Sequence, residues 1–156
     1  MQLTKKRRLL LLSAFLVIVG TQSLCAQKAA IDFFQGSWAE ALIQAEKEQK
    51  LIFVDAYTTW CGPCKLMSSK VFTDKKVSKF YNAHFINVKL DVEKGEGIDF
   101  GATYNIKAVP SLLYVKPDGK IVREYSGYQA ACNFLALGKK VAMFAPHSSP
   151  KLDAAK

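Results

Sequence analysis

Trp60-Cys61-Gly62-Pro63-Cys64-Lys65 is the stretch that decides how the rest of this 156-residue chain is interpreted. It follows the apolar run Leu51–Ala56, which predicts a buried strand, and Pro63 suits the first turn of a helix. We therefore expect Cys61 at a helix N-terminus, where unpaired backbone amides and the helix dipole favour an ionised thiolate. Cys64 lies one helical turn further on and is expected to be shielded. The arrangement predicts thiol–disulfide exchange, in which Cys61 attacks a substrate disulfide and Cys64 resolves the mixed disulfide.

The spacing of the two cysteines also allows a zinc site or a structural bridge. A tetrahedral zinc site needs two more ligands, but His84, His147 and Cys132 supply no second pair at a suitable spacing. In the chain-entropy model, a disulfide that closes so small a loop stabilises the fold by about 2 kcal/mol, against about 3 kcal/mol for a fifteen-residue loop. A bridge that staples the fold would gain more by joining distant segments. We therefore favour exchange chemistry, and we expect no metal and no organic cofactor.

Helical and strand patterns alternate along the rest of the chain. Ser37-x-x-Glu40 has the form of a capping box at the start of an amphipathic helix, and Pro117-Asp118-Gly119-Lys120 predicts the turn of a hairpin. The alternation predicts the α/β class, with one domain at 27–145 and a frayed C-terminal tail at 146–156. The expected helices lie at 37–49, from the cysteine pair to about 70, from 73 or 74 to 82, and from about 129 to 144. The expected strands lie at 51–56, 85–90, 111–115 and 121–125, and a loop with a helical turn is expected at 95–104.

Four further positions match one family pattern, in order along the chain. Asp55 stands six residues before the first cysteine of the pair, and Lys89 lies in the second apolar strand. Val109-Pro110-Ser111 leads into the third strand, and Gly127 follows the hairpin. Together with the cysteine stretch, these residues resemble the thioredoxin family. The resemblance implies the thioredoxin fold, in which helices flank a central mixed β-sheet.

The resemblance also implies roles for the matching residues. Asp55 would relay a proton to or from Cys64, with Lys89 as its modulator. The Val109–Pro110 bond would be cis, with the Val109 backbone exposed to pair with a substrate strand. The other residues implied at the substrate site are Trp60, Gly62, Pro63 and Gly127, of which Gly62 and Pro63 are associated with a reducing pair. The residues alone leave other readings open: an Asp55 that only pairs with Lys89, a Pro110 that starts a strand, and a half-buried Trp60.

Other positions depart from thioredoxins proper. Ser69 stands where that group carries a proline, five residues after the second cysteine. The stretches Val71–Asp74 and Gly95–Gly97 look more like secreted thioredoxin-like proteins and the soluble domains of periplasmic electron-transfer proteins. Cys132 lies on the last predicted helix near Phe134, and we expect it to be a buried apolar thiol, with regulatory or intermolecular pairing as the alternative.

The first 26 residues have the pattern of a secretory signal peptide, with a cationic start at Lys5–Arg8, an apolar run and small residues up to Ala26. We expect cleavage after Ala26 and a periplasmic or secreted protein. The alternatives are an uncleaved N-terminal membrane anchor and lipid attachment at Cys25. Removal of four cations and no acids lowers the formal charge from +9 to +5. The remaining lysines are scattered and form no nucleic-acid motif, so we expect no binding to nucleic acid.

The expected partners are disulfide-containing client proteins and a membrane thiol-electron carrier that re-reduces the cysteine pair. We expect the protein to be a monomer. Two rival functions come from other classes. One is a non-enzymatic thioredoxin-fold chaperone or adaptor with incidental cysteines, and the other is a metallochaperone that presents Cys61 and Cys64 to copper(I).

Overall fold

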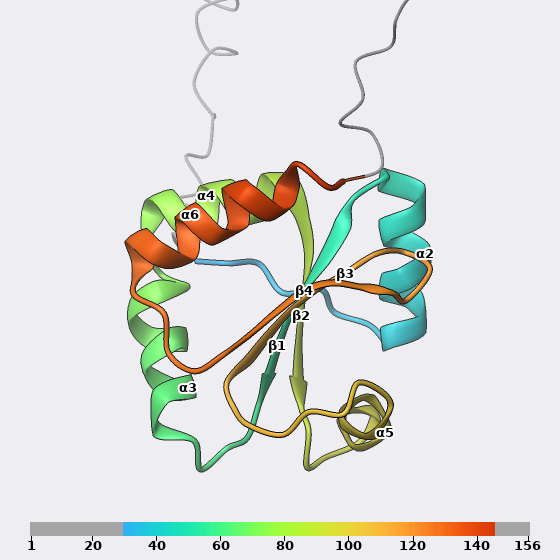
Figure 1. Cartoon of the computed structure of the whole chain (residues 1–156), viewed down its shortest axis with the longest axis horizontal. Coiled ribbons are helices and arrows are strands. Elements are labelled where there is room, and N and C mark those ends of the chain that lie inside the picture. The colour runs from blue at the N-terminus through green and yellow to red at the C-terminus, as the bar shows by residue number, and fades with distance from the viewer. Residues whose placement is uncertain (1–29, 146–156) are drawn as a thin grey trace, which may run out of the picture.

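A four-stranded mixed sheet forms the centre of the computed structural model, which describes residues 30–145 (Figure 1). The predicted signal peptide at 1–26, with Cys25 and the cleavage site after Ala26, and the predicted tail at 146–156 lie outside the described residues. The elements in chain order are α2 (Trp38–Glu48), β1 (Leu51–Tyr57), α3 (Gly62–Leu66), the π-helix η1 (Met67–Val71), α4 (Lys75–His84), β2 (Phe85–Asp91), α5 (Glu96–Thr103), β3 (Ser111–Val115), β4 (Ile121–Ser126) and α6 (Ala131–Ala142).

The strands lie in the order β2-β1-β3-β4. β1 pairs in parallel with β2 and antiparallel with β3, and β3 and β4 form the predicted hairpin. The two central strands are buried almost throughout, which explains why each is a nearly continuous apolar run in the sequence. Asp55 is the charged exception in β1, and its register partner in β2 is Lys89. The central mixed sheet expected from the sequence is confirmed.

Alternate side chains of β1 enter two apolar clusters, one on each face of the sheet. Leu51 and Phe53 belong to the cluster under α4 and α6, and Ile52 and Val54 belong to the cluster under α2. Figure 1 shows α4 and α6 on one side of the sheet and α2 and α5 on the other. Helices therefore cover β1 on both faces, and the carboxyl end of this strand leads directly to the cysteine pair.

Two helix starts that the sequence indicated are confirmed. Ser37 caps α2 through a complete capping box with Glu40. Asp74, rather than Thr73, caps α4, because its carboxylate accepts hydrogen bonds from two backbone N–H groups of the first turn.

The segment at 95–104 corrects the sequence prediction, because it forms the eight-residue helix α5 rather than a loop with a helical turn. Its glycines lower the helix propensity, but packing against α2 outweighs that effect. The ring of Phe100 is buried, and its centroid lies 5.0 Å from that of Trp38. Gly97 passes so close to the end of β2 that a Cβ there would lie 2.0 Å from the Asp91 carbonyl oxygen. Glycine therefore allows α5 to approach the sheet.

The helix predicted after the cysteine pair changes its winding part of the way along. α3 continues directly into η1, a single π-helical segment in which Ser69 occupies the position of the missing proline. A π-turn inserts an extra residue into a helix and changes which side chains face the core. Here Met67 and Val71 are buried and Ser68 is half-buried, whereas Ser69 is exposed.

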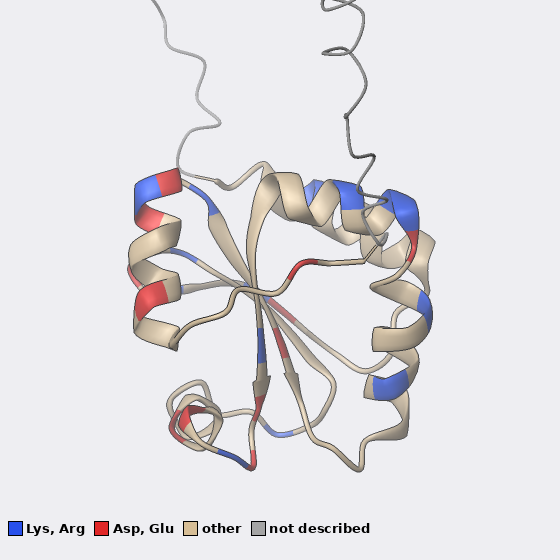
Figure 2. Cartoon of the chain, turned by 180° about the vertical axis from the view of Figure 1, so that it is seen from behind, with Lys and Arg blue, Asp and Glu red and all other residues tan. Residues whose placement is uncertain are grey.

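The helices on the two sides of the sheet differ in charge, with lysines on one side and mainly acidic residues, together with Lys47 of α2, on the other (Figure 2). The lysines of one side are on α3, η1, α4 and α6, at Lys65, Lys70, Lys75, Lys76, Lys79, Lys139 and Lys140. The acids of the other side are on α2 and α5, at Glu40, Glu46, Glu48, Glu96 and Asp99. In the described part of the chain, no helix has the length and apolarity needed to span a membrane.

Candidate active site

The cysteine pair lies where the loop after β1 enters α3. Cys61 is the N-cap residue of α3, and its Sγ accepts a hydrogen bond of 3.1 Å from the backbone N–H of Cys64. The two residues form a disulfide, with their Cα atoms 5.3 Å apart. Both cysteines are buried. The predicted position of Cys61 at a helix N-terminus is confirmed, and the N–H group at its sulfur is a donor of the kind that stabilises a thiolate.

Asp55 is fully buried, at 0% exposure, in the middle of the sheet. Its Oδ2 accepts a hydrogen bond of 2.7 Å from the Lys89 Nζ, and its Oδ1 has no hydrogen-bond partner. Burial raises the pKa of Asp55 above its ordinary value, and the opposing effect of the Lys89 charge is smaller. Asp55 is therefore both the ion-pair partner of Lys89 and a carboxyl group that holds its proton more tightly than an exposed one.

Lys89 is held from several sides. Its Nζ also donates a hydrogen bond of 2.7 Å to the Ser68 Oγ, which comes from η1. The same Nζ lies 4.5 Å from the ring centroid of Tyr57 and 5.4 Å from those of Phe33 and Phe72. Sequence reasoning missed Ser68, although the neighbouring departure from the proline pattern marked this turn as unusual.

Trp60 lies at the surface beside the pair, and 67% of it is exposed. Its indole N–H donates to both carboxylate oxygens of Glu93, at 3.0 and 2.9 Å. Glu93 comes from the loop after β2, and the backbone N–H of the preceding Val92 donates to the Tyr57 carbonyl oxygen at 2.9 Å. The half-buried Trp60 that the residues left open is therefore not found. Its partner Glu93 was not found from the sequence, because nothing in the pattern brings that loop to the tryptophan.

The Val109–Pro110 peptide bond is cis, as the family resemblance implied. Gly127 has a φ of +90°, and its N–H donates a hydrogen bond of 2.8 Å to the Pro110 carbonyl oxygen. Ser111, the next residue after this proline, is the register partner of Ala56 near the end of β1. The proline loop therefore lies at the same end of the sheet as the cysteine pair.

The remaining two predicted substrate-site residues, Gly62 and Pro63, are exposed in the first turn of α3. A Cβ on Gly62 would meet no atom within 4 Å, so the protein itself does not demand glycine there. The glycine leaves the surface next to Cys61 unobstructed. The predicted substrate-site residues thus lie around the carboxyl end of β1, and Asp55 and Lys89 lie two residues before the ends of β1 and β2.

The expectation of a buried Cys132 is wrong, because this cysteine is free and exposed on α6. Phe134 is fully buried, and two residues along a helix correspond to a rotation of about 200°, which turns Cys132 to the opposite side. Its Sγ lies 3.5 Å from the Asn133 Oδ1.

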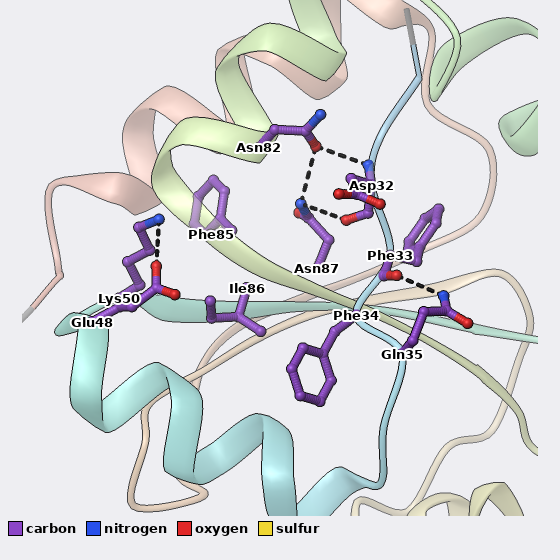
Figure 3. A pocket seen from close by; sticks show the side chains of 10 residues that line it. All are labelled: Asp32, Phe33, Phe34, Gln35, Glu48, Lys50, Asn82, Phe85, Ile86 and Asn87. Carbon is purple, nitrogen blue, oxygen red and sulfur yellow. Dashed lines mark hydrogen bonds and ion pairs between the residues drawn. The ribbon is translucent and has the colours of Figure 1, made fainter. Parts of the chain in front are cut away.

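A cavity of about 330 Å³ lies at the opposite end of β2 from the cysteine pair (Figure 3). The side chains of Asn87 and Asn82 point toward each other there, and Lys50 and Glu48 form an ion pair of 2.7 Å at its edge. None of the lining residues is a cysteine, so the cavity is separate from the cysteine pair. Among residues 30–145, no group of three or more His, Cys, Asp or Glu side chains is placed to hold a metal ion.

Comparison with known proteins agrees with this arrangement. The model of the thioredoxin-like domain family matches residues 38–142, more than half of the chain. Thioredoxin of Gallus gallus is 36% identical over 88 residues, which are 56% of this chain and 76% of that protein. For three other curated thioredoxins, two from Drosophila melanogaster and one from Pyricularia oryzae, the chain spans 64%, 52% and 48% of their length.

Two solved structures resemble the fold. A protein of Bacteroides thetaiotaomicron, described as a candidate disulphide isomerase, is 44% identical with a TM-score of 0.64, over 75% of this chain and 94% of that one. A thioredoxin from Thermus thermophilus is 20% identical with a TM-score of 0.66, over 81% of this chain and 98% of that one. The thioredoxin fold expected from the sequence is confirmed.

Proposed function

The chain belongs to the thioredoxin-like family, and we propose that it is a thiol–disulfide oxidoreductase that reduces disulfides in extracytoplasmic client proteins. The observation that carries the proposal is the Cys61–Cys64 disulfide at the start of α3, with a backbone N–H donating to the Cys61 Sγ. The buried carboxyl group of Asp55 lies on the strand that leads to the pair, and burial raises its pKa.

The reaction is a transfer of two electrons by two disulfide exchanges. The Cys61 thiolate attacks one sulfur of the client disulfide, forms a mixed disulfide and displaces the other client sulfur as a thiolate. The Cys64 thiol gives its proton to the Asp55 carboxylate and attacks the Cys61 Sγ, which releases the second client thiolate. The client thiolates take up protons from water, and Asp55 later returns its proton to solvent. The product state is the Cys61–Cys64 disulfide of the structure.

The surface around the pair supports an extended client segment as the substrate. The backbone of Val109 precedes the cis-proline, and we propose that it pairs with the client strand. Gly127, which hydrogen-bonds to Pro110, adds no side chain beside the proline loop, and Trp60 provides an exposed apolar edge.

The location and the electron source are part of the proposal. The pattern of residues 1–26 supports a periplasmic or secreted protein, with the membrane anchor and the Cys25 lipoprotein as its alternatives. A membrane thiol-electron carrier would re-reduce the pair, and no metal or organic cofactor takes part because the dithiol itself carries the electrons.

The test is a trapping experiment with Cys64→Ser, expressed in the native host. We expect disulfide-linked client proteins on Cys61, and none when Cys61→Ser is added. Cys132→Ser is the matched control, because it removes the exposed thiol and should leave the trapped set unchanged. Reduction of insulin with a chemical reductant should be lost in Cys61→Ser. Recovery of no linked partner under oxidising or reducing conditions would contradict the proposal.

The same experiments distinguish the rival functions. A chaperone or adaptor keeps its activity in Cys61→Ser, and a copper(I) metallochaperone, once reduced, binds the cation stoichiometrically through Cys61 and Cys64. The likeness to the Bacteroides thetaiotaomicron protein makes isomerisation a second candidate function. Recovery of activity from scrambled ribonuclease, without added reductant, measures that function directly.

A further inference from the structure

We propose that Ser68 is a positioning residue of the exchange site, because its hydroxyl oxygen fixes the Lys89 ammonium group against the Asp55 carboxylate. This inference rests on the proposed function, in which Asp55 accepts the proton of Cys64. Ser68 forms no hydrogen bond with either cysteine, so it acts through Lys89.

The geometry of Lys89 carries the inference. Its Nζ donates one hydrogen bond to the Asp55 Oδ2 and one to the Ser68 Oγ, each of 2.7 Å. A quarter of the Lys89 side chain is exposed, at 25%, so water competes for the ammonium group. Ser68 is half-buried in η1 and gives that group a protein acceptor in addition to the carboxylate. Without that acceptor, the lysine head can turn toward solvent, since its long stem is flexible.

Aromatic rings complete the enclosure of the Lys89 Nζ. The rings of Tyr57, Phe33 and Phe72 attract the ammonium group but offer it no hydrogen-bond acceptor aimed at a fixed point. A hydrogen bond is directional, whereas a cation over a ring tolerates displacement. Among the uncharged groups around the Lys89 ammonium, the Ser68 hydroxyl is therefore the one that fixes the orientation of the ammonium.

The winding of the chain explains why serine can do this here. Ser68 lies in the π-helical segment Met67–Val71, which begins one turn after the cysteine pair. The family resemblance leads one to expect a proline next to it, and the chain has Ser69 instead. π-turns of this kind recur at functional sites because they redirect individual side chains. The Ser68 hydroxyl and the altered winding therefore occur together in this chain.

The consequence concerns the proton affinity of Asp55. The Lys89 charge lowers the pKa of Asp55, against the larger effect of burial. A loosened ammonium group stabilises the carboxylate less, so removal of the Ser68 hydroxyl should raise the pKa of Asp55 further. Asp55 must be ionised to accept the Cys64 proton, so the pH at which resolution becomes fast should move upward.

Other charged groups near Asp55 do not account for such a shift. Its register partner in β3 is the apolar Leu112. Tyr57, two residues along β1, has a pKa raised first by burial and then by Asp91 and Asp55, so it stays neutral over the working range. Cys64 contributes a proton only when the disulfide is reduced.

The test compares Ser68→Ala with two matched variants of the same turn. Ser69→Ala removes an exposed hydroxyl one residue away, and Ser68→Thr keeps the hydroxyl in place. The first readout is the titration of the Asp55 carboxyl carbon by NMR in the oxidised protein, which does not depend on activity. We expect an upward shift in Ser68→Ala, smaller than that of Lys89→Met, and no shift in either matched variant.

The second readout is the rate at which the mixed disulfide with a model peptide resolves, measured between about pH 5 and 9. Below the midpoint, Ser68→Ala should resolve it roughly two- to tenfold more slowly, which is the factor that corresponds to one hydrogen bond. In the Lys89→Met background, Ser68→Ala should have no further effect. If Ser68→Ala unfolds, the Ser68→Thr and Ser68→Val pair replaces it, because only valine lacks the hydroxyl.

Two results overturn the inference. One is a Ser68→Ala titration identical to that of Ser69→Ala, and the other is a Ser68 effect that persists undiminished without Lys89. Failure of the proposed function looks different. In that case the parent protein reduces no disulfide, although the Asp55 titration still responds to Ser68 and Lys89.

Discussion

Replacement of Asp55 by Asn should stabilise the oxidised protein at pH 8 and leave its stability almost unchanged at about pH 3. Asp55 has no exposed surface, and burial is the largest cause of its raised pKa. The native state therefore holds the Asp55 proton more tightly than the unfolded chain does. As the pH rises above the ordinary carboxyl value, the unfolded chain gives up this proton first, and the free energy of unfolding falls. Asn keeps the volume of the side chain but has no proton to lose.

Two opposing effects set the size of the change that Asp55→Asn makes in the free energy of unfolding. The ion pair with Lys89 is short, at 2.7 Å, but the lysine is partly exposed and water screens its charge. Removal of a carboxylate from water costs several kcal/mol even after relaxation. Where desolvation wins, replacement of Asp55 by a neutral side chain of similar volume raises the free energy of unfolding at pH 8, by about 1.4 kcal/mol for each pKa unit by which folding raises the Asp55 pKa. With a urea slope near 2 kcal/mol per molar, each such unit corresponds to a midpoint roughly 0.7 M higher.

The assay is urea unfolding of the oxidised protein, followed by circular dichroism from about pH 3 to 9. Asp118→Asn is the control, because its effect on stability should depend on pH in the opposite direction. The pKa of Asp118 is lowered by a hydrogen bond from the Lys120 backbone, so this carboxylate stabilises the fold above its unfolded pKa, and the stabilisation is lost on acidification. If Asp55→Asn is less stable than the parent at pH 8, the ion pair outweighs burial. That result would refute the assignment of Asp55 as a proton acceptor with a raised pKa.

Three further predictions concern packing and surface chemistry. Gly138→Ala would place a Cβ 2.8 Å from two ring atoms and the hydroxyl oxygen of the buried Tyr81. We expect it to lower the free energy of unfolding by about 1–3 kcal/mol in urea titrations, despite a helix-propensity gain near 1 kcal/mol; equal stability would mean that the Tyr81 side chain can move. Cys132→Ser should lower the number of rapidly reactive thiols in the native oxidised protein by one, and an unchanged count with a thiol reagent would contradict its exposure. Glu93→Ala should free the Trp60 indole and raise the KM for insulin roughly two- to fivefold with little change in kcat. An unaltered KM would show that this hydrogen bond does not hold Trp60 in a position that helps to bind the substrate.

The strands and helix caps were predictable because their signals are local. Leu51–Ala56 is apolar in an almost unbroken run, as a strand covered on both faces must be. Ser37 and Asp74 indicate the starts of helices, because N-cap side chains accept hydrogen bonds from backbone N–H groups two or three residues further on. The Asp55–Lys89 pairing was also accessible, because two neighbouring parallel strands in register place the two residues side by side.

Features that depend on tertiary contacts could not be predicted from the sequence. α5 forms although its glycines disfavour a helix, because Phe100 packs on Trp38 and Gly97 allows close approach to the sheet. Cys132 faces outward because the rotation of α6 is set by the burial of Phe134, and apolar neighbours in sequence did not reveal that rotation. Glu93 reaches Trp60 from a loop more than thirty residues away.

Asp55 and Ser68 lead to one argument about why this site is built as it is. A buried carboxylate with one oxygen lacking any partner is not explained by stability, since a neutral side chain of the same volume should fold better. Residues that a fold retains against its own stability concentrate where chemistry needs them. Lys89 limits the destabilisation while leaving the Asp55 pKa raised, and the Ser68 hydroxyl fixes how much of the lysine charge reaches the carboxylate. If Asp55→Asn both stabilises the protein and slows resolution of the mixed disulfide, the two effects have a single origin in the buried charge.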